Sequence, residues 1–154
     1  MRKAISGFSL ILLALALTCF GSERGFAAPR STVKPAMDAI ATHIALLRSG
    51  SPQQQAAAAY WLGQQHHAAA DAVDPLVELL GNAITVDPTR YRSNRFLQKL
   101  TLGEEAAAAL VNIGHSSIEP LIRVLKSSPL PIARRNAAWA LGALHDAGAT
   151  GNEI

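Results

Sequence analysis

The side chains best suited to hold an acidic or anionic partner lie within ten consecutive residues, RYRSNRFLQK, at positions 90–99. An arginine guanidinium binds a carboxylate or a phosphate through two parallel hydrogen bonds, and aromatic rings stack on sugars and bases. The stretch therefore indicates a surface for an acidic protein, an anionic lipid or a polysaccharide, with nucleic acid less favoured. Alternatively, it is a solvated loop whose rings anchor it to the core. The candidates are Arg90, Tyr91, Arg92, Arg95, Phe96 and Lys99.

A second set of candidates is aromatic and lies among alanines. Tyr60 and Trp61 belong to AAAAYWLG, and Trp139 belongs to the similar segment RRNAAWALG, where it aligns with Tyr60. Tyrosine and tryptophan are frequent anchors of protein interfaces. These three residues therefore either line a concave binding groove or fill the core.

Histidines form a third set, because His66, His67, His115 and His145 follow similar segments and are expected in the turns after them. A row of imidazoles can bind Zn²⁺, Ni²⁺ or Cu²⁺. However, neighbouring helix pairs lie about 8–10 Å apart, whereas a Zn–N bond measures about 2.0–2.1 Å. His66, His67 and His115 are therefore weak metal candidates, and the alternative is a favourable position near helix C-termini.

The sequence contains no known catalytic motif. It has no glycine-rich phosphate loop, no nucleophile elbow and no HExxH pattern. Asp71, Asp74 and Glu78 have the spacing of one polar helix face, and Glu104 and Glu105 stand where a helix N-terminus favours negative charge. We therefore expect neither an enzyme nor a cofactor.

Residues 1–27 have the features of a secretory signal peptide. A short basic head precedes an apolar run at residues 8–20, and Gly25 and Ala27 supply the small residues of a cleavage site. The run is shorter than the roughly 20 residues that span a bilayer. We expect export to the periplasm or the cell exterior after cleavage near Ala27. The alternatives, an uncleaved anchor or lipidation of Cys19, are the only cases in which a membrane contact is expected.

Charge and cysteine usage restrict the mature chain further. The whole chain carries a net charge of +3, but residues 1–27 contribute +2 of it, which does not favour a nucleic-acid partner. Cys19, the only cysteine, precedes the cleavage site. The processed chain then has no disulfide and no thiolate metal site, so its fold must rest on packing alone.

An internal repeat organises the remaining chain. Similar alanine-rich segments occupy residues 55–67, 103–115 and 134–146, and leucine-rich segments at 71–81 and 116–126 follow the first two. Their apolar spacing is helical. Each helix pair leaves an apolar edge that only the next pair can cover, so the pairs are expected to stack into a solenoid.

This repeat sets the predicted boundaries. They are a signal peptide at 1–27, a flexible lead-in at 28–35, a repeat domain at 36–146 with an insertion at about 82–102, and a tail at 147–154. Residues 36–48 are predicted to form a leading helix, the second half of a capping repeat. The helix at 134–146 is expected to end the stack exposed or to pack on a partner, which allows self-association.

The segments AAAAYWLG, IEPLIRVL and RRNAAWALG resemble the HEAT-like repeats of phycobilisome lyases and of many bacterial scaffold proteins. The resemblance implies an all-α fold, a short right-handed superhelical solenoid of antiparallel helix pairs of the HEAT or armadillo type. Repeats of this family usually place an aspartate before an arginine at the start of the first helix. Here Arg134 and Arg135 match the arginine, the aspartate is missing, and Gln53–Gln55 replace both in the first repeat.

The expected function is that of an exported protein–protein interaction or scaffolding module. The alternative is a module that binds an anionic envelope polymer or lipid through Arg90–Lys99. A metal-binding protein or a bilin-lyase-like enzyme is a distant third possibility. The lyase is disfavoured because such an enzyme would meet its pigment in the cytoplasm, whereas this chain is expected to be exported. The His-Glu pairs of HEAT-like di-iron hydroxylases do not occur in the chain.

Overall fold

A computed structural model describes residues 33–93 and 98–148. The predicted signal peptide, Cys19, most of the lead-in, and the candidates Arg95 and Phe96 lie outside these residues, as does most of the predicted tail. Within the described residues, no helix has the length and apolar character needed to cross a bilayer.

The described residues form six α-helices, which confirms the predicted all-α fold. They are α1 (Val33–Ser49), α2 (Pro52–Gly63), α3 (Val73–Leu79), α4 (Leu102–Ile113), α5 (Ile118–Ser127) and α6 (Pro131–Asp146). Short 3₁₀ helices η1 (His66–Ala72), η2 (Pro88–Arg90) and η3 (His115–Ser117) and the strands β1 (Thr85–Val86) and β2 (Leu100–Thr101) connect them. The predicted leading helix is α1, which starts at Val33, inside the segment assigned to the lead-in.

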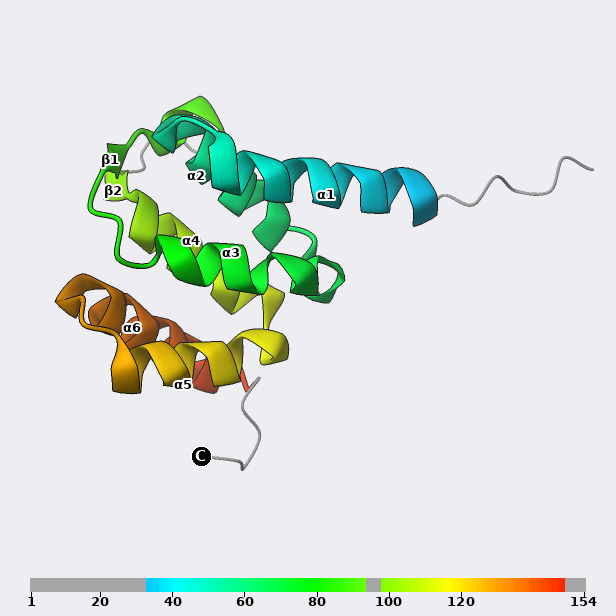
Figure 1. Cartoon of the computed structure of the whole chain (residues 1–154). Coiled ribbons are helices and arrows are strands. Elements are labelled where there is room, and N and C mark those ends of the chain that lie inside the picture. The colour runs from blue at the N-terminus through cyan, green and yellow to red at the C-terminus, as the bar shows by residue number, and fades with distance from the viewer. Residues whose placement is uncertain (1–32, 94–97, 149–154) are drawn as a thin grey trace, which may run out of the picture. The chain divides into compact units, whose positions relative to one another are not determined.

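The helices lie in two layers, as expected of a solenoid (Figure 1). Helix α4 packs between α2 and α6 in one layer, while α1, α3 and α5 form the other. Small residues make the close contact between α2 and α4 possible. A Cβ added to Gly63 would lie only 3.0 Å from the Cα of Ala109.

Local signals explain where the helices begin and end. Ser51 and Thr101 cap α2 and α4, and each exchanges hydrogen bonds with the third helical residue, Gln54 or Glu104. Such a capping box satisfies amide groups that the helix itself cannot pair. Gly114 then ends α4 at a φ of 90°, a backbone conformation that glycine adopts without strain.

One hydrophobic core runs between the layers. Its fully buried leucines come from every α-helix of the described chain, and each contributes roughly 1.5–3 kcal/mol by leaving water. They include Leu47, Leu62, Leu76, Leu110, Leu121 and Leu144. Leucines and alanines therefore hold the layers together, as the repeat pattern predicted.

The insertion between α3 and α4 is anchored to α2. Its strands pair antiparallel, with Val86 opposite Leu100. Gln53 of α2 donates to the Asp87 carbonyl at 2.8 Å and accepts from the Asp87 amide at 3.1 Å. Val86 is buried against Ala56 of α2. The described strands of the insertion are therefore held beside α2.

Candidate functional site

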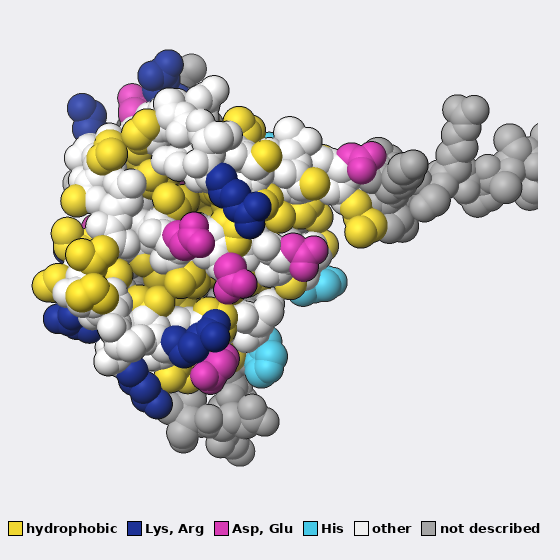
Figure 2. All heavy atoms as spheres, in the orientation of Figure 1, with side chains coloured by type: hydrophobic (Ala, Val, Ile, Leu, Met, Phe, Trp, Pro, Cys, Tyr) yellow, Lys and Arg dark blue, Asp and Glu magenta, His cyan; other side chains and the backbone are white. Residues whose placement is uncertain are grey.

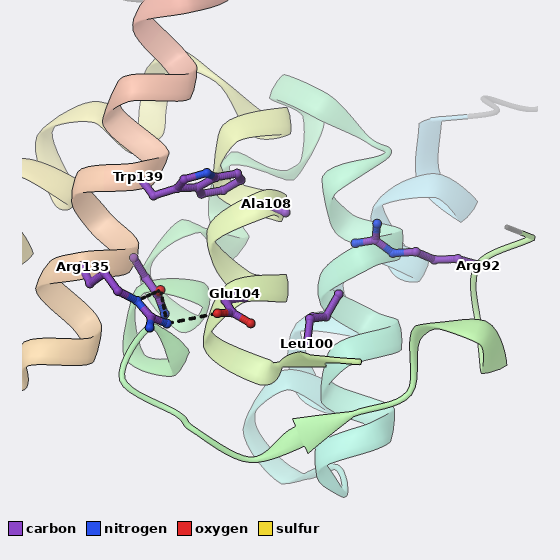
Figure 3. Close-up of a pocket in the computed structure, with 7 residues that line it drawn as sticks. Arg92, Leu100, Glu104, Ala108, Arg135 and Trp139 are labelled. Carbon is purple, nitrogen blue, oxygen red and sulfur yellow. Dashed lines mark hydrogen bonds and ion pairs between the residues drawn. The ribbon is translucent and has the colours of Figure 1, made fainter. Parts of the chain in front are cut away.

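A hollow lies over α4, between α6 and the insertion. We call it the Trp139 hollow. It has a volume of about 420 Å³ and is lined by Arg92, Leu100, Glu104, Ala108, Arg135, Asn136 and Trp139. The side chain of Trp139 extends from α6 toward Ala108, while Arg92 approaches from the insertion (Figure 3). More than half of the Trp139 surface, 56%, is exposed.

A small residue at one repeat position opens this hollow. In the repeat alignment, Ala108 of α4 occupies the position of Tyr60 in α2 and of Trp139 in α6. A ring at position 108 would fill the space that alanine leaves. The hollow therefore arises where the row of aromatic residues on this layer is interrupted.

The α6 side of the hollow carries a polar rim. Arg135 Nη2 lies 3.1 Å from Glu104 Oε1 in an exposed ion pair, and the Arg135 Nε and Nη2 groups donate to Asn136 Oδ1. The amide of Asn136 in turn donates to the Leu80 carbonyl at 2.8 Å. Asn136 is buried, so the guanidinium of Arg135 rests on a fixed base at the edge of the hollow.

On the insertion side, the Glu105 carboxylate is buried and gathers two predicted candidates. Tyr91 Oη donates to Glu105 Oε2 at 2.7 Å, and Arg92 forms an ion pair with Glu105. The Arg92 guanidinium also lies over the Tyr60 ring, with 4.7 Å from its carbon to the ring centroid. Burial, together with the hydrogen bond to Glu105, raises the pKa of Tyr91 above its ordinary value.

The basic stretch is therefore divided. Tyr91 and Arg92 face the protein, and only 22% of the Arg92 side chain is exposed. Among the described residues of the stretch, Arg90 and Lys99 are the cations that face solvent. The structure thus places Arg92 and Trp139 on opposite sides of one hollow and leaves the two exposed cations outside its lining.

Tyr60 and Trp61 line a second, separate hollow of about 330 Å³ together with Tyr91. The Trp61 ring stacks on His43 of α1, with ring centroids 3.9 Å apart. Tyr60 and Trp61 are half-buried, in contrast to Trp139. The aromatic candidates therefore do not form one continuous groove.

The other layer carries a smaller hollow of about 180 Å³, lined by residues of α1 and η1. In this layer, basic and acidic side chains are interspersed with apolar ones over α1, α3 and α5 (Figure 2). A mixed surface of this kind is typical of a solvated face. The hollows of about 420 and 330 Å³, by contrast, are lined by aromatic rings of α2, α6 and the insertion.

The structure places three of the four histidines in the connections that the repeat indicated. His66 and His67 lie in η1 and His115 in η3, as expected, but the expected turn position of His145 is wrong, because α6 extends through it. His66 Nδ1 lies 3.1 Å from the Asn112 carbonyl oxygen. Among residues 33–93 and 98–148, no group of three histidine, cysteine or acidic side chains is arranged to hold a metal ion.

Sequence reasoning missed most of the hollow's lining. Leu100, Glu104, Ala108 and Asn136 were not proposed as binding residues, and Arg135 was noted only for its place in the repeat. The available signal was the repeat alignment, in which the second repeat has alanine at position 108 where the first and third repeats have Tyr60 and Trp139.

Two segments of the chain, residues 54–82 and 104–127, match the model of the PBS lyase HEAT-like repeat. They correspond to α2 with α3 and to α4 with α5, which confirms the resemblance and the predicted pairing of helices. The comparisons with curated proteins and with solved structures found no match.

Proposed function

We propose, from the premise that this chain is a helical module of HEAT-like repeats, that it is exported and binds a protein partner through the α2/α4/α6 layer. The Trp139 hollow is the proposed contact. The module acts by binding rather than by catalysis and needs no cofactor. The signal-peptide features of residues 1–27 support its export.

The exposure of Trp139 carries the proposal. Burying a large apolar side chain contributes roughly 1.5–3 kcal/mol of free energy. An exposed tryptophan forgoes much of this contribution. Tryptophan and arginine dominate the binding energy of many interfaces, and here Trp139 and Arg135 lie at the rim of the same hollow. A partner that covers them would gain affinity from both.

Site-specific cross-linking tests the contact. A photoreactive amino acid placed at position 108 or 139 should capture a partner in the native host, whereas one at position 37 should not. Met37 is a matched control, because it is an exposed apolar residue of α1 in the other layer. Equal capture at positions 37 and 139 would contradict the proposal.

Substitution of the anchor gives a second measure. Trp139→Ala should weaken partner binding about 30-fold, the effect of a strong interface anchor, while Met37→Ala should leave it unchanged. Export is tested on the same samples: N-terminal sequencing of the extracytoplasmic protein should begin at Ala28. A chain that begins at Met1 and stays inside the cell would refute the export half of the proposal.

Binding of an anionic polymer or lipid is the second candidate, and the exposure of Arg90 and Lys99 favours it. Replacing both with glutamate leaves the buried contact between Arg92 and Glu105 intact. Salt-sensitive binding to anionic vesicles that disappears in this double variant would support the second candidate, while unchanged partner capture in the variant would support the first.

A further inference from the structure

We infer that the Trp139 hollow receives a short acidic peptide segment of the partner. A bulky apolar side chain of that segment lies against Trp139 and Leu100, and a neighbouring carboxylate reaches Arg135. The inference rests on the proposed function and narrows it to one partner chemistry.

The apolar half of the hollow determines the first requirement. Trp139 supplies an exposed ring, while Leu100 and the methyl group of Ala108 supply apolar surface beside it. A volume of about 420 Å³ lies in the lower part of the range of about 300–1,000 Å³ found for ligand pockets. It suits one large side chain with its adjoining backbone, and a ring in it would gain from contact with the indole.

The polar half determines the second requirement, because each of its acceptor oxygens already receives a hydrogen bond from the protein. Glu104 accepts hydrogen bonds from Arg135 and from the Thr101 amide. Asn136 Oδ1 accepts from Arg135, and its amide nitrogen donates to Leu80. The carboxylate and the amide oxygen of the rim therefore serve the protein's own donors.

Donor capacity remains on the α6 side of the hollow. The Arg135 side chain is 61% exposed, and its bonds to Glu104 and Asn136 use Nε and Nη2, which leaves Nη1 for a ligand. Opposite it, Arg92 Nε is buried and the Arg92 guanidinium is already paired with Glu105, so Arg135 supplies the donor that a ligand can reach. An acceptor with negative charge complements such a rim, and a carboxylate matches a guanidinium in shape.

Blocked tetrapeptides test this chemistry directly. The full chain is titrated with acetyl-Gly-Phe-Asp-Gly-amide and with its asparagine and lysine counterparts, and the indole N–H signal of Trp139 is followed by NMR. The chain has only two tryptophans, so Trp139→Phe identifies the signal. The aspartate peptide should bind about two to five times more tightly than the asparagine peptide, the range for an exposed ion pair.

Two variants separate shape from charge. Ala108→Tyr places at this position the residue that α2 carries, fills the hollow and should abolish binding of every peptide. Arg135→Gln should remove the preference for aspartate over asparagine while binding persists, and Arg135→Lys should restore part of it. Met37→Ala is the control and should change nothing.

The outcomes distinguish this inference from the proposed function. Equal binding of the three peptides, or no signal shift up to about 10 mM peptide, a very weak affinity, would overturn the acidic-peptide inference. Cross-linking of a partner at position 139 in that case would leave the proposed function intact. Failure of the cross-linking as well would overturn both.

Discussion

Helices α2 and α6 occupy the same place in their repeats but have opposite surroundings. In α2, Ala59 is fully buried, and a Cβ on Gly63 would meet the Ala109 Cα at 3.0 Å. At the equivalent positions of α6, Ala138 is exposed and no described atom lies within 4 Å of a Cβ added to Gly142. The repeat motif thus specifies the surface of a helix, while the neighbouring repeat decides whether that surface becomes core.

The comparison predicts its largest difference in stability for two leucines at equivalent positions of α2 and α6. Leu62 of α2 is fully buried, whereas its counterpart Leu141 of α6 is half-buried. Leu62→Ala should lower the free energy of unfolding by about 2–5 kcal/mol, and Leu141→Ala by about 1 kcal/mol. Urea unfolding followed by circular dichroism measures both losses, and equal losses would contradict the difference between the helices.

The equivalent glycines should respond with opposite signs. Gly63→Leu forces a side chain into the contact with α4 and should cost about 1–3 kcal/mol of stability. Gly142→Leu adds a side chain in open space and replaces a poor helix former, so it should gain up to about 1 kcal/mol. Thermal unfolding of the two variants in parallel gives the comparison, and a loss of stability in the Gly142 variant would show that this face is covered.

Adjacent residues of α6 provide a smaller contrast between its two sides. Asn136 faces inward and donates to the Leu80 carbonyl, so Asn136→Ala leaves a buried acceptor unpaired and should cost about 1–3 kcal/mol. Arg135 forms an exposed ion pair, and Arg135→Ala should change stability by about 0–1 kcal/mol. Chemical denaturation of both variants decides whether the inner contact outweighs the outer one.

The smallest expected effect is the change in stability at high pH that comes from Tyr91, in the insertion beside α2. The raised pKa of Tyr91 means that the folded state holds the phenol proton more tightly than the unfolded state. Its contribution to stability is therefore complete below about pH 10, the ordinary tyrosine pKa, and is lost as the pH rises further. Tyr91→Phe should flatten the fall in stability above that pH. An unchanged slope in the variant would assign the loss to other groups.

The fold could be predicted because its signals are local and repeated. The spacing of alanines and leucines indicated the helices, and Glu104 and Glu105 marked the first turn of α4. The start of α1 at Val33 was missed, although Ser31 and Thr32, residue types that favour an N-cap, directly precede it in the sequence. The family match at residues 54–82 and 104–127 follows the same repeated spacing.

The candidate site could be predicted only in part, because it depends on contacts between distant residues. Trp139 was selected by its type and place in the repeat. The pairing of Arg92 with Glu105 joins the insertion to α4, and residue type alone does not reveal such a partner. Ala108 contributes by lacking a side chain, which no search for chemical groups detects. The roles of Arg90, Arg95, Phe96 and Lys99 toward a partner stay predictions.

The hydrogen bond from Asn136 to the Leu80 carbonyl affects how cooperatively the repeats unfold. In a simple repeat stack, each unit touches only its neighbours, and terminal units can peel off separately. Here Asn136, in the third repeat, donates a hydrogen bond to the Leu80 carbonyl at the end of α3, in the first repeat. The bond passes the start of α4, where Gly103 has no side chain to block it. This bond ties the outermost helix to the first repeat, so the three units should melt as a single cooperative block.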